Sequence, residues 1–477
     1  MTLATKQQSN PELFATRYDR SDCSLGVVHV GYGAFHRAHQ AVYLDDYMDQ
    51  TGDLRWGITA INLRAGESSA FANSSQVENG YILKTTSPEG DKELRLVRSH
   101  CQFLDWSQDA GAAESAIANP NVHMITITVT ESGYYLNDDF SLNTNDPLIK
   151  DEISGAQTSS IYAFLTSGLK QRYQEIGNPV NILCCDNIRS NGHMLDNNFK
   201  HYLTLKGETE LLAWVEDNVS FPCSMVDRIT PRADEALHQE IAESFGVGHF
   251  DPIHGEAFSQ WVVERKFCAP MPDIGKVGVE IVDDVDPYEE AKIRILNGGH
   301  TGLCYLGALA GHDTYDQAFM DPKLRQFFDN YETKEVLPGL DMELPLNKEE
   351  YLAKIAKRFS NRAIADQLAR ICMDGFSKMP VFIRPTLESC LKQGITPIHG
   401  YDCVASWYVY ARRTVSGNMP IPYYETYWNL LEPLLKAGQE TEFAQSKRLW
   451  ADLPTQYPGF VDGLTNAITE MEKQWPV

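Results

Sequence analysis

The sequence has no hydrophobic run long enough to cross a bilayer, and its first residues lack the basic and apolar regions of a signal peptide. Basic residues are few, because 41 Lys and Arg stand against 65 Asp and Glu, which gives a net charge of −24. This balance argues against nucleic acid or an anionic membrane surface as the main partner. We therefore expect a protein of the cytoplasm whose partners are small molecules.

Cysteines are scattered, and none of the ten belongs to a Cys-x-x-Cys motif. Only Cys184 and Cys185 are adjacent, inside an apolar segment that is typical of a buried strand. This pattern argues against a disulfide framework and against a tetrahedral zinc site. A reducing compartment and metal-independent chemistry are the expectations that follow.

The chain of 477 residues is too long for one ordinary core, so we expect two domains. Its first part alternates short apolar runs with helical patterns, and the runs lie at 25–30, 56–61, 122–129, 180–185 and 278–282. After Asp286 helical periodicity dominates, as at 348–373, 385–393 and 424–436. The sequence thus predicts an α/β fold. A Rossmann-like domain with a mostly parallel sheet spans 1–278, and a mainly α-helical domain spans 279–477.

A glycine turn follows the first apolar run. Gly31 and Gly33 stand between that run and a helical pattern over 34–48, which suits the pyrophosphate of a dinucleotide. The usual third glycine is missing, and His36 stands in its place. Arg37 and His39 could add positive charge to a phosphate site. Two glycines alone are a weak signal. The prediction of a dinucleotide-binding turn therefore depends on the strand before them and the helix after them.

The second apolar run lacks the acidic residue that ordinarily binds the adenosine ribose. Asn62 could bond the ribose hydroxyls instead, while Arg64 could receive a 2′-phosphate. NAD is therefore the expected cofactor. NADP is not excluded, because Arg64 could bind its 2′-phosphate. The alternative is that Arg64 is only a solvated residue at the start of a loop.

A polar helix is predicted to begin at Asp286, a good N-cap that is followed by Pro287. Within it, Lys292, Asn297 and His300 fall in an arc of about 140° at 100° per residue. A lysine in a buried site can take the proton of an alcohol, and amide and imidazole groups can bond the developing alkoxide. The alternative is a capped surface helix with a solvated lysine.

Two further features favour a functional role for this helix. Gly298 and Gly299 each cost roughly 1 kcal/mol relative to alanine inside a helix, which is easier to understand where a ligand or a backbone comes close. Asn187 follows the buried strand at 180–185, and ligand sites of open α/β sheets lie beyond the carboxyl ends of strands. An Asx-turn that caps the next helix explains Asn187 equally well.

These pieces together resemble the polyol-specific long-chain dehydrogenase/reductase family, the mannitol dehydrogenase family. The matching segments run in order through nearly the whole chain, at 31–40, 128–134, 185–192, 225–231, 260–264 and 292–300. Segments at 87–90, 133–137, 287–297 and 374–378 look most like the D-arabinitol 4-dehydrogenase branch. The resemblance implies hydride transfer between a secondary alcohol and NAD without a metal.

The resemblance also implies roles for single residues. Lys292 matches the general base, Asn187 and Asn297 match the pair that holds the reacting oxygen, and Glu289 matches a glutamate that passes the proton to solvent. His300 matches a residue that orients the substrate, and Arg370 and Lys378 match basic residues that contact it. The matched cofactor-binding residues are Gly31, Gly33, Ala34, Phe35, His36, Arg37, Asn62, Arg64, Thr130, Glu131 and Asp227.

The expected reaction is the oxidation of D-arabinitol to D-xylulose, with the polyol bound between the domains. D-mannitol oxidation to fructose and a fructuronate reductase (mannonate oxidoreductase) activity are the alternatives within the family. A zinc-dependent alcohol dehydrogenase and a nucleotide sensor without catalysis are the alternatives outside it. The sequence shows no heptad seam, so a monomer or a small homo-oligomer is expected.

Overall fold

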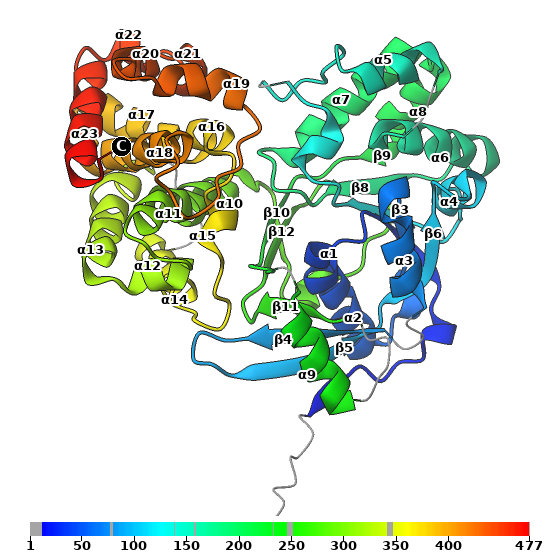
Figure 1. Cartoon of the computed structure of the whole chain (residues 1–477). Coiled ribbons are helices and arrows are strands. Elements are labelled where there is room, and N and C mark those ends of the chain that lie inside the picture. Colours follow the sequence, from blue (N-terminus) through cyan, green and yellow to red (C-terminus); the bar gives the residue numbers. More distant parts are fainter. Residues whose placement is uncertain are drawn as a thin grey trace, which may run out of the picture. The chain divides into compact units, whose positions relative to one another are not determined.

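The computed structural model describes residues 12–76, 80–137, 139–156, 159–231, 233–245, 251–340 and 347–476. The chain forms two compact units (Figure 1), and each is described by itself. The first comprises Met1–Ser87 and Asp91–Val285, and the second comprises Pro88–Gly90 and Asp286–Val477. Strand β13 (Glu280–Val282) pairs with β12 (Gln260–Glu264) and therefore belongs to the first unit, beyond the predicted boundary at residue 278.

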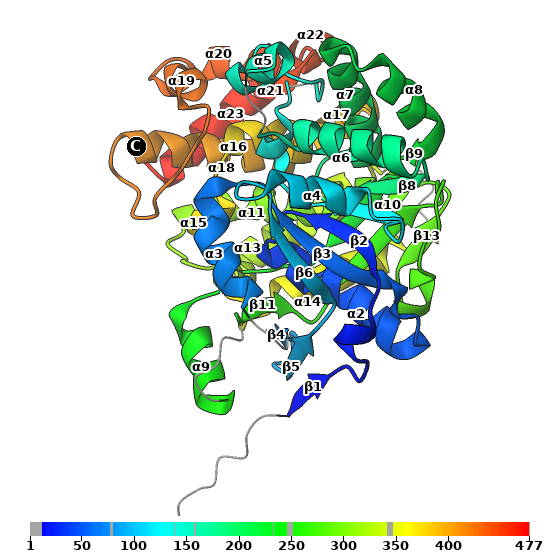
Figure 2. The same cartoon turned by 90° about the vertical axis from the view of Figure 1, so that its right-hand side faces the viewer.

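A six-stranded sheet forms the centre of the first unit, and every neighbouring pair in it is parallel. Its order is β6 (His100–Asp105), β3 (Gly57–Asn62), β2 (Leu25–Val30), β7 (Met124–Ile127), β8 (Val180–Cys184) and β9 (Val219–Ser220). In order of sequence within this sheet, the strands are arranged 3-2-1-4-5-6, the doubly wound order of dinucleotide-binding folds. The predicted Rossmann-like fold is thus confirmed, and Figure 2 shows β2, β3 and β6 side by side.

The four inner strands β3, β2, β7 and β8 are buried on both faces, which explains why they read as continuous apolar runs. The outer strands β6 and β9 are more polar and less buried, and they were not predicted. Val28, Ile125 and Ile182 pack on one face against the helices α4 (Ala110–Ile117), α6 (Ile161–Glu175) and α7 (Asn191–Lys206). Val27, Met124 and Leu183 pack on the other face against α2 (Gln40–Thr51). The other described α-helices of the unit are α1 (Ala34–Ala38), α3 (Ser68–Ser75), α5 (Pro147–Ser154), α8 (Thr209–Asn218) and α9 (Glu235–Phe245).

The unit has two smaller described sheets, and of their strands only β13 was predicted, as the run at 278–282. One has the order β1 (Leu13–Ala15), β5 (Lys92–Val97), β4 (Tyr81–Thr86) and β11 (Ile253–Glu256), and the other has the order β10 (Ser224–Asp227), β12, β13. The pairs β4–β5 and β10–β12 are antiparallel. The other strands are short and most carry polar residues, so apolar periodicity did not reveal them.

The described residues of the second unit form helices and no named strand, as predicted. Helix α10 (Asp286–Ala291) continues through the π-helix η6 (Lys292–Asn297) into α11 (Gly298–Leu309), which packs against α18 (Ile398–Val415). The other α-helices are α12 (Tyr315–Met320), α13 (Pro322–Tyr331), α14 (Lys348–Phe359), α15 (Leu368–Ile371), α16 (Gly375–Lys378), α17 (Arg384–Lys392), α19 (Trp428–Leu431), α20 (Glu440–Ala444), α21 (Lys447–Trp450), α22 (Leu453–Gln456) and α23 (Phe460–Gln474). Two further π-helices are η7 (Glu332–Val336) and η8 (Met379–Ile383).

Three predicted helices differ from the structure. The helix over 34–48 is interrupted at His39, whose φ of −126° and ψ of −93° are not helical. The helix over 348–373 stops at Phe359, and Ala365 in the following loop has a φ of +44°. The helix over 424–436 shortens to α19 and a 3₁₀ turn. Among the described residues, none of the helices combines the length and apolar character that a bilayer span requires.

Candidate functional site

The turn after β2 depends on glycine at its first position. Gly31 has a φ of +98°, and a Cβ built on it would lie 2.0 Å from the carbonyl oxygen of Thr128, so a side chain is excluded. Gly33 differs, because a Cβ there would meet no heavy atom closer than 3.9 Å. Protein packing therefore requires Gly31 but not Gly33. The open space at Gly33 is what the close approach of a ligand to the backbone needs.

The residue in place of the third glycine, His36, points into the core. Its ring is fully buried and stacks on His29 with the ring centroids 3.2 Å apart, and its Nε2 lies 2.9 Å from Nε2 of His100. Burial lowers the pKa of all three imidazoles, that of His29 to about 3, so they are neutral. A cofactor contact of His36 would therefore have to come from its backbone. His39 is also buried, with its Nε2 2.8 Å from the Gln260 carbonyl oxygen.

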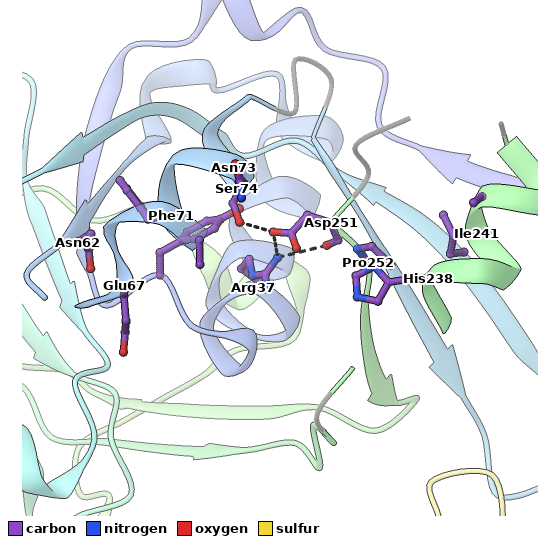
Figure 3. Close-up of a pocket in the computed structure, with 13 residues that line it drawn as sticks. Arg37, Asn62, Glu67, Phe71, Asn73, Ser74, His238, Ile241, Asp251 and Pro252 are labelled. Atoms are coloured by element: carbon purple, nitrogen blue, oxygen red, sulfur yellow. Dashed lines mark hydrogen bonds and ion pairs between the residues drawn. The ribbon is translucent and has the colours of Figure 1, made fainter. Parts of the chain in front are cut away.

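A cavity of about 530 Å³ opens beside this turn in the first unit (Figure 3). Arg37 lines it and forms an ion pair with Asp251 at 2.6 Å, and Ser74 donates to the same carboxylate at 2.5 Å. Arg37 is therefore already neutralised, which differs from the free phosphate-binding cation that the sequence suggested. The cavity is also lined by Tyr32 of the glycine turn and by Asn62 and Glu67.

The predicted ribose contacts lie at the end of β3. The Asn62 side chain bonds the backbone of Arg64 twice, accepting from its N–H at 3.2 Å and donating to its carbonyl at 3.0 Å. The Arg64 guanidinium is half exposed and pairs with Glu67 at 3.3 Å. Arg64 is thus neither a lone solvated residue nor an unpaired cation.

The loop after β7 is held by Asp186 of the neighbouring strand end. Its carboxylate accepts from the N–H groups of Val129 (2.9 Å) and Thr130 (3.0 Å) and from the hydroxyl of Tyr134 (2.7 Å). Burial raises the pKa of Asp186 to about 6, against the lowering effect of these bonds. Thr130 has a φ of +66°, a conformation that costs energy and occurs often at functional sites.

The turn that Asp186 begins leaves Asn187 exposed, directly beyond the carboxyl end of β8. Glu131, which follows Thr130, is also exposed. Asp227 is buried at the end of β10, opposite Gln260. The first unit thus brings Asn187 and the 130–131 loop to the edge of the sheet where ligands of this fold bind.

In the second unit, the predicted helix contains a π-helical turn that the periodicity argument did not foresee. The turn covers Lys292–Asn297, and its i→i+5 bonding brings residues five apart onto one face. Lys292 and Asn297 are such a pair. Their side chains therefore leave the helix axis in more similar directions than they would in an α-helix. The Lys292 residue is only 6% exposed, and Glu289 one turn earlier is 8% exposed.

The two glycines after this turn are explained by protein neighbours. A Cβ on Gly298 would lie 3.1 Å from the carbonyl oxygen of Phe382 in η8, and one on Gly299 would lie 2.6 Å from Oε1 of Glu332 in η7. The predicted close approach therefore exists, and it is made by two other π-helical turns rather than by a ligand. Burial raises the pKa of the Glu332 carboxyl well above its ordinary value.

Asn297 has a donor that the protein leaves unused. Its Nδ2 is buried and finds no acceptor among the described residues. A buried amide without a partner costs about 1–3 kcal/mol, unless a ligand or water supplies the acceptor. The unused donor fits a group that bonds a substrate oxygen.

His300 lies one helical turn further along α11. Its ring stacks on Phe359 at 5.3 Å and meets Tyr315 edge-on at 4.3 Å. Burial lowers the pKa of His300 to about 3, and charges of Asp366, Arg370, Lys378 and Arg358 act on it. The unit thus gathers the predicted His300, Arg370 and Lys378 in one place.

The two basic residues at His300 are not free cations. Arg370 forms a two-bond ion pair with Asp366, and Lys378 donates to the carbonyl of Ile371 at 2.8 Å. Burial also lowers the pKa of Lys378. Sequence reasoning missed Asp366 and Arg358, since no motif or period marks them.

Comparison with known proteins agrees with this arrangement. The family model of the mannitol dehydrogenase Rossmann domain matches residues 25–276, and that of the mannitol dehydrogenase C-terminal domain matches residues 284–472. The chain belongs to the mannitol dehydrogenase family. It is therefore an oxidoreductase, and the predicted resemblance is confirmed.

Individual members of the family cover nearly the whole chain. D-arabinitol 4-dehydrogenase of Ralstonia nicotianae is 35% identical over 90% of this chain and 92% of its own length. Mannitol 2-dehydrogenase of Pyrenophora tritici-repentis is 32% identical over 96% of this chain and 81% of its own. The solved structure of Pseudomonas fluorescens mannitol 2-dehydrogenase in a ternary complex with NAD and D-mannitol is 30% identical, with a TM-score of 0.87 over 97% of this chain and 95% of that one.

The close packing of the glycine turn at Gly31 leads to a testable prediction. Gly31→Ala should lower the free energy of unfolding by about 1–3 kcal/mol more than Gly52→Ala does. Both glycines have positive φ, but Gly52 has no heavy atom within 4 Å of a built Cβ, so it controls for backbone strain alone. Urea unfolding measures both, and equal losses would contradict the close packing of Gly31 on Thr128.

A second prediction concerns pH. The pKa of His300 is about 3 in the folded protein and 6.5 in an unfolded chain, so protonation favours unfolding. As the pH falls from about 6.5 toward 4, the wild type should lose stability relative to His300→Gln, by at most about 1.4 kcal/mol per pH unit. Between pH 7 and 9 the difference should be constant. A difference that stays constant down to pH 4 would contradict a neutral His300.

Proposed function

We propose that this protein is an NAD-dependent polyol dehydrogenase that oxidises D-arabinitol to D-xylulose. The observation that carries the proposal is the π-helical turn, which holds on one face a buried lysine and an amide whose buried Nδ2 has no acceptor among the described residues. Oxidation of a secondary alcohol needs this combination, a base for the hydroxyl proton and a donor for the oxygen that becomes negative. Similarity to D-arabinitol 4-dehydrogenases supports the choice of substrate.

Lys292 is the proposed general base. Its side chain is nearly buried, and in its neutral form the amine can accept the proton of an alcohol. The proton would leave by way of Glu289, the nearly buried carboxylate one helical turn earlier. Neither step needs a metal ion, because the amine itself takes the proton.

Two amides are the proposed donors to the reacting oxygen. Asn297 offers the Nδ2 group that has no acceptor among the described residues, and Asn187 of the first unit is proposed as the second donor. Preorganised donors of this kind each contribute about 3–4 kcal/mol to a transition state that carries a developing oxyanion. His300 would orient the polyol as a neutral imidazole, because it is uncharged at working pH.

The first unit fits NAD. Gly33 leaves open space beside the backbone at the start of α1, and the adjoining cavity of about 530 Å³ is lined by Tyr32 and Asn62. Bound there, NAD supplies the acceptor for the hydride. The proposed contacts are Gly31, Gly33, the backbone of residues 34–37, Asn62, Thr130, Glu131 and Asp227. The Arg64–Glu67 pair places a carboxylate near the ribose end, which disfavours a 2′-phosphate and so supports NAD over NADP.

D-mannitol is the second candidate substrate. The similarity to mannitol 2-dehydrogenases supports it, including the solved complex that contains D-mannitol. An aldonate such as D-mannonate is less well supported, because its carboxylate needs an unpaired cation. Arg370 is already neutralised by Asp366, and Lys378 is bound to a backbone carbonyl.

Initial rates test this function directly. The chain, treated with a chelator until no metal remains, is assayed with D-arabinitol, D-mannitol, D-sorbitol and D-mannonate, each with NAD and with NADP. The highest kcat/KM is expected for D-arabinitol with NAD, with D-xylulose as the product. A higher value for D-mannitol would replace the substrate but keep the reaction. Activity that disappears on chelation, or tight NAD binding without turnover of any polyol, would contradict the proposal.

A further inference from the structure

Three side chains with metal-binding atoms converge at one end of β12, and none of them is among the candidate site residues named above. They are His193 in α7, Cys223 just before β10 and Glu264 at the end of β12. One ligand atom from each lies within 4.8 Å of the other two. A nitrogen, a sulfur and an oxygen ligand form a set that zinc accepts. Sequence spacing could not reveal this set, because the three residues come from separate elements.

The backbone around these residues is fixed. Cys223 and Glu264 are bound twice, because the Glu264 N–H donates to the Cys223 carbonyl at 2.9 Å and the Cys223 N–H donates to Glu264 Oε2 at 3.1 Å. The Asn191 side chain bonds the N–H and the carbonyl of Ser224 at 2.9 and 2.8 Å, which ties the start of α7 to β10. A Cβ on Gly192 would lie 2.5 Å from the Phe221 carbonyl oxygen. His193 is therefore carried on a helix end that cannot drift away from Cys223.

The ammonium group of Lys266 lies beside the three possible metal ligands. The Lys266 ammonium is 2.5 Å from Glu264 Oε1 and 3.4 Å from Nε2 of His193. Cys223 and Asp284 also act electrostatically on it. The Lys266 side chain is 55% exposed, so it can swing into solvent, whereas Glu264 is buried and keeps its place. The cluster thus already binds a cationic group, the ammonium of the exposed Lys266 side chain, which another cation could displace.

We propose that His193, Cys223 and Glu264 form a binding site for Zn²⁺ or a similar thiophilic divalent ion, which competes with Lys266. Zinc bonds of about 2.0–2.3 Å bring the three ligand atoms to roughly 3.5 Å from one another. The exposed imidazole of His193 supplies this adjustment. Binding releases the thiol proton of Cys223 and displaces the Lys266 ammonium, and water completes the coordination. The proposal uses none of the residues to which a role in the dehydrogenase reaction is assigned above.

Cadmium binding to the full chain tests the site, because a Cd²⁺–thiolate bond absorbs in the ultraviolet. One equivalent of Cd²⁺ should produce this band in the chelator-treated wild type. Lys266→Met should bind about tenfold more tightly or better, because it removes the competing charge. Zn²⁺ should displace the Cd²⁺ and raise the melting temperature, since an ion that binds the folded state stabilises it.

Matched variants identify the ligands. Cys223→Ser should lose the band, and Cys268→Ser should keep it, because Cys268 is an exposed thiol outside the cluster. His193→Ala changes an exposed residue and should fold normally, yet it should weaken Cd²⁺ binding at least about tenfold. The proposal is overturned if Lys266→Met binds no tighter than the wild type, if the band survives in Cys223→Ser, or if His193→Ala binds as tightly as the wild type.

Discussion

The geometry of the second unit depends on close contact between three π-helical turns. A Cβ on Gly298 would lie 3.1 Å from a backbone carbonyl oxygen of η8, and a Cβ on Gly299 would lie 2.6 Å from the Glu332 side chain of η7, so either addition would force a neighbour to shift. The buried guanidinium of Arg294 secures the same region, since it donates to Thr386 Oγ1 at 2.9 Å and to Glu290 at 3.0 Å. The π-helical turn at 292–297 is thereby held in a conformation that an isolated helix would not keep. Because of this π-helical turn, the side chains of Lys292 and Asn297 lie on the same face of the helix.

A different constraint shapes the edge of the parallel sheet in the first unit. There, one carboxyl group fixes a whole loop, because Asp186 accepts three hydrogen bonds from Val129, Thr130 and Tyr134. The glycine turn is fixed by contact of Gly31 with Thr128 and rests on buried, neutral histidines. Charges in this region are neutralised in pairs, as Arg37 with Asp251 and Arg64 with Glu67. The open positions that remain, such as Gly33, are where a ligand can approach the backbone.

Apolar runs and glycine positions predicted the four inner strands of the Rossmann-like sheet, because strands buried on both faces leave a clear signal, but they missed the outer strands β6 and β9. Periodicity also found the helix from Asp286 onward, but it assumed 100° per residue and so missed the π-helical turn, which depends on contacts with distant segments. The same limit applies to His36, whose burial by His29 and His100 follows from tertiary packing alone. The pairing of Arg370 with Asp366 was equally hidden. The sequence thus allowed us to name candidate functional residues. Their burial, ion pairs and charge states could be known only from the folded structure.

The central claim is that Lys292 acts as the base. Chemical rescue tests it most directly, because a small amine can replace the missing side chain. Lys292→Ala should bind NAD normally and turn over D-arabinitol at least about 10³-fold more slowly than the wild type. Added alkylamines should restore activity in proportion to the concentration of the unprotonated amine. Near-normal turnover in Lys292→Ala, or rescue by an inorganic salt to the same extent, would contradict the account.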